Sequence, residues 1–198
     1  SDSPTKPEIK KVTGGTKLTE YATFAMSLEN DMTDYHMLAF KYDGSWYATS
    51  LVWVYNPGAF GIFEDLHGLE VSIEQLVPGG EPEIIVRTEH GRHDTDMGLD
   101  EEEDVSTKEV TVLGIHDGKP MLMLDAVEAY TYYRGRIGAI PDDELPRDLV
   151  SDKLPIKSKS GLSVTFDKKG NVTLGKKDGF TPSEGITLGT RALIDGEK

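Results

Sequence analysis

Three glycine-containing turn pairs constrain the fold of this 198-residue chain more than any other feature. Asp43-Gly44, Asp117-Gly118 and Lys169-Gly170 each stand between two runs rich in β-branched, aromatic or leucine residues. A two-residue turn of this kind between β-prone runs indicates a hairpin, because glycine adopts the positive φ angles that tight turns need. The sequence therefore predicts three antiparallel hairpins, and we expect their turns to be exposed to solvent.

One further pair of strands is predicted between the first two hairpins. Residues 69–76 alternate apolar and polar side chains, as a strand with one buried face does. Pro78-Gly79-Gly80 then turns the chain into a second β-prone run at 82–88. Residues 18–28 fit a short helix and a strand equally poorly, and residues 137–150 are mostly a connection with room for one helical turn. The sequence therefore predicts an all-β or β-dominated fold, an antiparallel sandwich or barrel built from hairpins, with at most short helices.

Composition agrees with this class and sets the domain organisation. The hydrophobic fraction is 37%, and 21 Gly and 10 Pro indicate many turns rather than long helices. The length suits one domain with a substantial core. Residues 1–17 are polar and contain two prolines, so we expect a flexible N-terminal tether followed by a single β-rich domain at 18–198, whose residues 151–198 form a basic subregion.

The charge restricts the classes of partner. The formal net charge is −14, and residues 18–150 hold 27 acidic and only 8 basic residues. Such a field repels phosphate backbones and anionic lipid surfaces, which argues against a nucleic-acid partner. No apolar run is long enough to span a membrane. A basic protein or a divalent cation is the partner that the charge favours.

Acidic residues are concentrated at 90–104, where seven carboxylates and two imidazoles are predicted to form a loop between two strands. Carboxylates that alternate with other residues around a glycine allow a loop to place oxygen ligands around Ca²⁺. The alternative is a solvated loop whose carboxylates repel one another. The candidate oxygen ligands are Asp94, Asp96, Asp100 and Glu101.

Two histidines of this segment are candidate nitrogen ligands for Zn²⁺ or a similar ion. His90 and His93 are three residues apart, so in a strand they point to opposite faces and converge only if the chain turns at Gly91. The alternative is that both rings hydrogen-bond to neighbouring carboxylates. No Gly-x-Ser-x-Gly, His-Glu-x-x-His or phosphate-binding glycine loop occurs, so no catalytic residue is predicted.

Aromatic residues are frequent in the strand that follows the first turn pair. Trp46, Tyr47, Trp53 and Tyr55 lie there, and Tyr130, Tyr132 and Tyr133 lie in a later strand. Large rings fill the core of a sandwich, and this is the favoured interpretation. The alternative is a platform on one sheet face for a sugar or a peptide.

Residues 76–87, Leu-Val-Pro-Gly-Gly-Glu-Pro-Glu-Ile-Ile-Val-Arg, resemble the Pro-Glu-apolar stretch of FG-GAP or VCBS-type extracellular β-repeats. The resemblance covers about a dozen residues and implies a location outside the cytoplasm. In those repeats the turn carries calcium-binding aspartates, whereas Pro78, Gly79 and Gly80 occupy it here. The resemblance therefore implies no calcium ligands at this turn, and one copy cannot form a propeller.

These observations predict a non-enzymatic binding or structural β-module with an acidic loop that binds a divalent cation or a basic partner. The polar N-terminal segment without an initiator Met leads us to expect an extracytoplasmic protein, whether secreted, periplasmic or lipid-anchored. The chain has no cysteine, which excludes disulfides and thiolate metal sites. The alternative function is a metal-dependent hydrolase that uses His90, His93 and Asp94.

Overall fold

The structure is a computed structural model that describes residues 7–27, 33–55, 62–95, 101–136, 155–177, 179 and 187–193. In these ranges the chain forms strands, turns and extended links and no helix, which confirms the predicted all-β class. The expected connection at 137–150 lies outside the described residues. The strands are β1 (Lys10–Lys11), β2 (Leu18–Ser27), β3 (Thr33–Tyr42), β4 (Ser45–Tyr55), β5 (Ile62–Glu74), β6 (Glu83–Asp94), β7 (Glu101–His116), β8 (Lys119–Arg136), β9 (Ile156–Phe166), β10 (Asn171–Lys177) and β11 (Gly189–Ala192).

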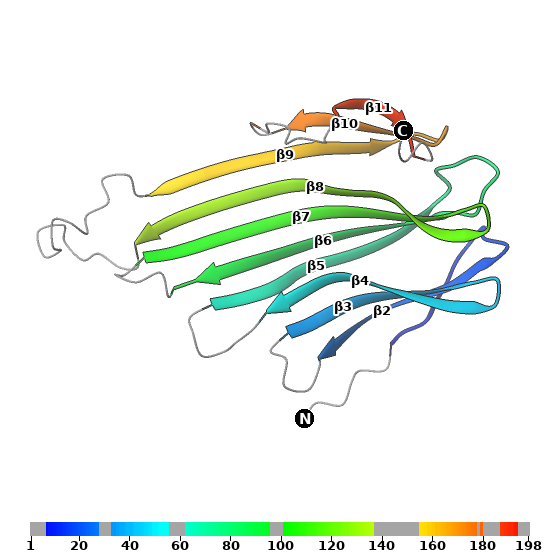
Figure 1. Ribbon diagram of the computed structural model, residues 1–198, viewed down its shortest axis with the longest axis horizontal. Helices are drawn as coiled ribbons and strands as arrows, with labels where there is room; N and C mark the ends of the chain where they lie inside the picture. Colours follow the sequence, from blue (N-terminus) through cyan, green and yellow to red (C-terminus); the bar gives the residue numbers. More distant parts are fainter. Residues whose placement is uncertain are drawn as a thin grey trace, which may run out of the picture.

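The strands form two antiparallel sheets (Figure 1). The small sheet has the order β1-β2-β3-β4, and the large sheet has the order β11-β10-β9-β8-β7-β6-β5. Within each sheet, every strand is therefore hydrogen-bonded to its neighbours in sequence. No ladder among the described strands joins β4 to β5, so the sheets do not close into one barrel, and the arrangement is consistent with a sandwich. No helix that could cross a membrane occurs in the described part of the chain.

The predicted hairpins are confirmed. Asp43 and Gly44 have φ angles of 48° and 81°, and Asp117 and Gly118 have 49° and 73°, two positive values in succession as in a type I′ turn. Gly170 has φ 85° and joins β9 to β10. The expected exposure is wrong for this glycine, because Gly170 is buried against the β5–β6 turn and its carbonyl accepts a hydrogen bond from the Leu193 N–H.

Two apolar clusters bury both faces of the large sheet near the β5–β6 turn. The inner face, which faces the small sheet, brings Ile84 and Val86 against Leu38 of β3. The outer face, on the opposite side, brings Ile85 against a cluster that includes Val172 of β10. Because successive side chains of a strand point to opposite faces, β6 needs an unbroken apolar run here.

Two predictions about strand residues are wrong. The segment at 90–104 is not one loop, because β6 continues to Asp94 and β7 begins at Glu101. Trp46 and Tyr47 are not core residues, since they remain 45% and 40% exposed on the small sheet. The side chains of Trp53 and Tyr55 lie outside what the structure describes. Residues 18–28, which the sequence left open, contain strand β2.

Part of the expected tether is joined to the fold. Lys10 and Lys11 pair with β2, and the Glu81 carboxylate accepts hydrogen bonds from the backbone N–H groups of residues 16, 17 and 18. The Thr16 hydroxyl also donates to this carboxylate. Burial by itself raises the pKa of Glu81, but these hydrogen bonds outweigh it, and the net pKa is lowered. The start of β2 is therefore fixed by a side chain 63 residues away.

Glu81→Ala is expected to reduce the free energy of unfolding by about 1–2 kcal/mol, because three backbone donors at a partly exposed site lose their acceptor. Since the folded-state pKa of Glu81 is lowered, its contribution is present at neutral pH and is lost as the pH falls through that pKa. Urea unfolding of the wild type and of Glu81→Ala at neutral and acidic pH tests this. A difference between them that does not shrink in acid would contradict the assignment.

Candidate functional site

The candidate site lies where β6 ends and β7 begins, on the outer face of the large sheet. Strand register places one row of five side chains across five adjacent strands. The row consists of Phe63, His93, Asp104, Tyr133 and Lys157. Paired residues of antiparallel strands point to the same face, so these side chains share one surface.

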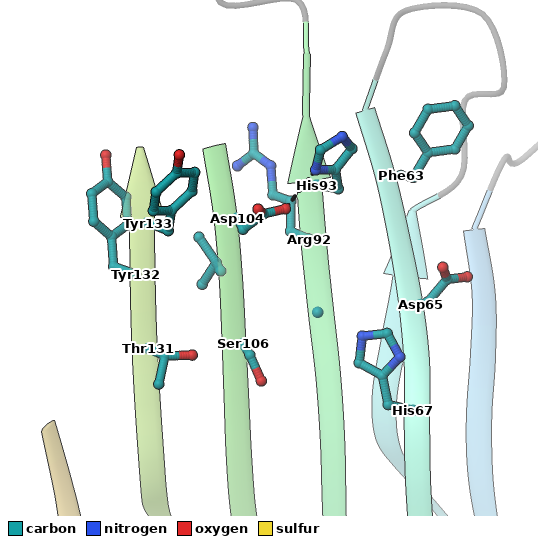
Figure 2. A pocket seen from close by; sticks show the side chains of 12 residues that line it. Phe63, Asp65, His67, Arg92, His93, Asp104, Ser106, Thr131, Tyr132 and Tyr133 are labelled. Atoms are coloured by element: carbon teal, nitrogen blue, oxygen red, sulfur yellow. Dashed lines mark hydrogen bonds and ion pairs between the residues drawn. The ribbon is translucent and has the colours of Figure 1, made fainter. Parts of the chain in front are cut away.

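A second row lies next to the first, one step toward the interior of the sheet. It consists of Asp65, Gly91, Ser106, Thr131 and Lys159. Except for Lys157 and Lys159, the residues of both rows line an open hollow of about 320 Å³, here called the outer hollow (Figure 2). Two aromatic rings, carboxylates, hydroxyls and imidazoles therefore face one concave surface. This is the mixture of apolar area and placed polar groups that ligand sites have.

His93 and Asp104 form a close polar contact at the centre of the first row. His93 Nδ1 lies 2.5 Å from an Asp104 carboxylate oxygen, and the two side chains are 41% and 53% exposed. An ion pair as exposed as this contributes only about 0–1 kcal/mol to stability. A ligand can therefore replace either partner at little cost.

Gly91 gives the outer hollow its depth. A Cβ atom at this position would lie 2.5 Å from His67 Nε2, which is closer than real Cβ contacts. His67 is the extra residue of a register shift in β5 between Leu66 and Gly68. Figure 2 shows its ring between β5 and β6, on the side of the hollow. The bulge in β5 and the absence of a side chain at Gly91 together leave room for the His67 imidazole against β6.

The structure separates the residues that the sequence proposed as metal ligands. His93 lines the outer hollow, whereas His90 lines a different hollow on the inner face. Asp94 accepts a hydrogen bond from Arg92 at 2.8 Å, and Glu101 accepts one from Arg134 at 2.6 Å. Asp96 and Asp100 lie outside the described residues. Within the described ranges, no three His, Asp or Glu side chains form a metal-binding group.

The acidic segment also has counter-charges that local sequence counting overlooked. Residues 81–104 hold 10 acidic and 2 basic residues, which predicts electrostatic strain. In the structure, Arg134 of β8 neutralises Glu101, and Lys108 of β7 lies 2.7 Å from Glu89. Glu103 accepts a hydrogen bond from the Tyr132 hydroxyl at 3.1 Å. Cross-strand pairs therefore allow acidic residues to continue as strands, which is why the long loop is absent.

Calcium binding by Asp94, Asp96, Asp100 and Glu101 stays a prediction. If Ca²⁺ binds only the folded segment, stability rises by about 2.7 kcal/mol at a hundredfold excess over Kd. Thermal melting in millimolar CaCl₂ and in NaCl of matched ionic strength tests this. A calcium-specific rise that is lost when Asp94, Asp96 and Asp100 are replaced by Asn supports the site, and equal shifts in both salts reject it.

Several residues of the outer hollow were not predicted from the sequence. Phe63, Asp65 and His67 precede the run that was recognised as a strand. The run Ile62-Phe63-Glu64-Asp65 does not alternate apolar and polar side chains, so sequence periodicity gave no signal for this half of β5. Comparison with protein-family models, curated proteins and solved structures finds no significant match to this chain.

Proposed function

We propose that the protein is a non-enzymatic binding module whose outer hollow binds a basic segment of a partner protein. The observation that carries this proposal is the pair of exposed carboxylates, Asp65 and Asp104, in a hollow bordered by the Phe63 and Tyr133 rings. The net charge of −14 favours approach of a cationic partner. The location outside the cytoplasm stays a prediction from the sequence.

A lysine or arginine side chain matches the chemistry of the hollow. Its charged group donates several hydrogen bonds, which a carboxylate accepts, so successive basic side chains of one segment can pair with Asp65 and with Asp104. Its methylene groups pack on the Phe63 ring, which is 43% exposed. Lys157 lies 5.2 Å from the centre of the Tyr133 ring, so the β9 side of the hollow already carries a cation. Arg92 also lines the hollow and is paired with Asp94, so the incoming basic group belongs beside Asp65 of β5 or Asp104 of β7.

The alternative function, a hydrolase with a metal on His90, His93 and Asp94, requires three ligands that converge. His90 and His93 lie on opposite faces of β6, and Asp94 is bonded to Arg92. Binding by exposed side chains of the outer hollow needs no such convergence. The geometry of the described residues therefore favours the binding module.

Fluorescence anisotropy with a labelled lysine-rich peptide tests the proposal, with a glutamate-rich peptide of equal length as the ligand control. We expect the basic peptide to bind, and the double variant Asp65→Asn/Asp104→Asn to bind it about tenfold more weakly, a loss of about 1.4 kcal/mol. Added salt should weaken binding, because exposed charges are screened.

A charge-matched control separates a local site from the long-range field. Asp43→Asn/Asp117→Asn also removes two charges, from exposed turn residues with positive φ that asparagine tolerates. We expect this variant to bind the basic peptide as the wild type does. Equal weakening by both double variants, or equal binding of the acidic peptide, would overturn the proposed site.

A further inference from the structure

The inner face of the large sheet changes character along its strands. Near the β5–β6 turn, Ile84 and Val86 of β6 contact the apolar core between the sheets. Farther along β6, the alternate positions of the same face are His90 and Arg92. Arg92 is 44% exposed and bonded to Asp94, whereas His90 is half-buried, and a polar group out of contact with water costs free energy unless it finds a partner. Packing alone therefore does not explain the polar half of this face.

These side chains line a second hollow of about 300 Å³, here called the inter-sheet hollow. Leu51 and Val52 of β4 form one wall, and Val105 of β7 adds apolar surface. The polar lining is Glu64, His90, Arg92, Thr107 and Glu109. Its volume is at the lower end of the range for small-molecule sites. The hollow therefore offers an apolar surface opposite a polar one.

Two hydrogen-bonding groups of the polar wall lie close together. His90 Nδ1 is buried and has no hydrogen-bond partner among the described residues. Burial raises the pKa of Glu109, while the nearby His90 opposes this rise and Asp125 adds to it. In a neutral histidine with the proton on Nε2, Nδ1 is an acceptor, as is a carboxylate oxygen. A donor that enters the hollow would satisfy both groups.

The charge of the hollow indicates what kind of donor fits. Arg92 is the cationic side chain of the lining, and it is bonded to Asp94 at 2.8 Å. The Glu109 carboxylate adds negative charge beside this ion pair. A bare divalent ion does not match, since the described His, Asp and Glu side chains form no metal-binding group. A larger organic cation does match this lining, because its N–H groups can donate to acceptors on separate side chains.

We propose that the inter-sheet hollow binds a small organic cation that carries a primary ammonium group on an apolar body. The ammonium group has three N–H donors, of which Glu109 and His90 Nδ1 accept two. The apolar body lies on Leu51 and Val52 of β4. Arg92 and Val105 line both hollows, but His90 and Glu109 line only the inter-sheet hollow, on the face of β6 opposite to His93.

Calorimetric titration of the full chain with n-hexylamine tests the site, with 1-hexanol and hexanoate as probes of the same length. We expect hexylamine to bind and the two other probes to bind at least about tenfold more weakly. Glu109→Gln keeps the shape of the side chain and removes its charge, and should weaken hexylamine binding by about tenfold. Asp65→Asn/Asp104→Asn should leave hexylamine binding unchanged.

Backbone NMR spectra of the same samples locate the bound probe and report whether the variant is folded. Shifts confined to residues around His90, Thr107 and Val52 support the inter-sheet hollow. A second variant, Val105→Trp, fills the hollow from β7 without changing its charge, and should also abolish hexylamine binding. Absence of hexylamine binding, equal binding of hexanol, or full binding by folded Glu109→Gln would overturn the proposal. None of these results would affect the basic-peptide site.

Discussion

Replacing Glu83 with alanine is expected to destabilise the protein by about 3 kcal/mol. Glu83 is only 2% exposed, and its carboxylate accepts hydrogen bonds from the backbone N–H groups of Leu76 at 2.7 Å and Val77 at 3.3 Å. Alanine would leave both donors without this acceptor, each at a cost of about 1–3 kcal/mol. Urea unfolding followed by circular dichroism measures the difference in free energy of unfolding.

Glu83→Gln is the matched control, because glutamine keeps a carbonyl acceptor in a side chain of the same size. Burial raises the pKa of Glu83, against the smaller opposing effect of its backbone hydrogen bonds. Since the folded-state pKa lies above the unfolded value, ionisation of Glu83 costs stability as the pH rises through this range. The glutamine variant should therefore gain stability relative to the wild type from acidic to neutral pH. A glutamine variant as unstable as the alanine variant would contradict this account.

Leu38→Ala is expected to cost about 2–5 kcal/mol, the range for removal of a buried leucine. Leu38 is fully buried in the cluster that joins β3 to the inner face of the large sheet. Trp46→Ala removes a larger side chain from a site that is 45% exposed, and should cost less than about 1 kcal/mol. Thermal melts of both variants test the contrast. If Trp46→Ala lost more stability than Leu38→Ala, this tryptophan would be packed as a core residue.

The hairpins were predictable because their signal is local. Asp43-Gly44 and Asp117-Gly118 specify turns from two residues, and the structure gives both residues of each pair positive φ angles. The exposure of Trp46 was not predictable, because it depends on which face of the small sheet meets the large sheet. Strand alternation defines two faces and does not say which one becomes buried.

The candidate site was only partly predictable, since it depends on register between strands distant in sequence. His93 was recognised from its acidic surroundings, and its partner Asp104 was counted as one more charge of a loop. The contact between them follows from the β6–β7 ladder, which places the two residues directly opposite each other. Likewise, Arg134 neutralises Glu101 from 33 positions farther along the chain. Local charge counting cannot include such a partner.

The order of strands in each sheet follows the order of the chain, and this has a consequence for folding kinetics. Every ladder joins strands that are adjacent in sequence, so no strand has to be inserted between two others that have already paired. Folding rates decrease as the sequence separation of contacting residues increases, because long loops must close before their contacts form. This chain should therefore fold faster than a Greek-key sandwich of equal length. Each completed hairpin provides the edge on which the next strand pairs.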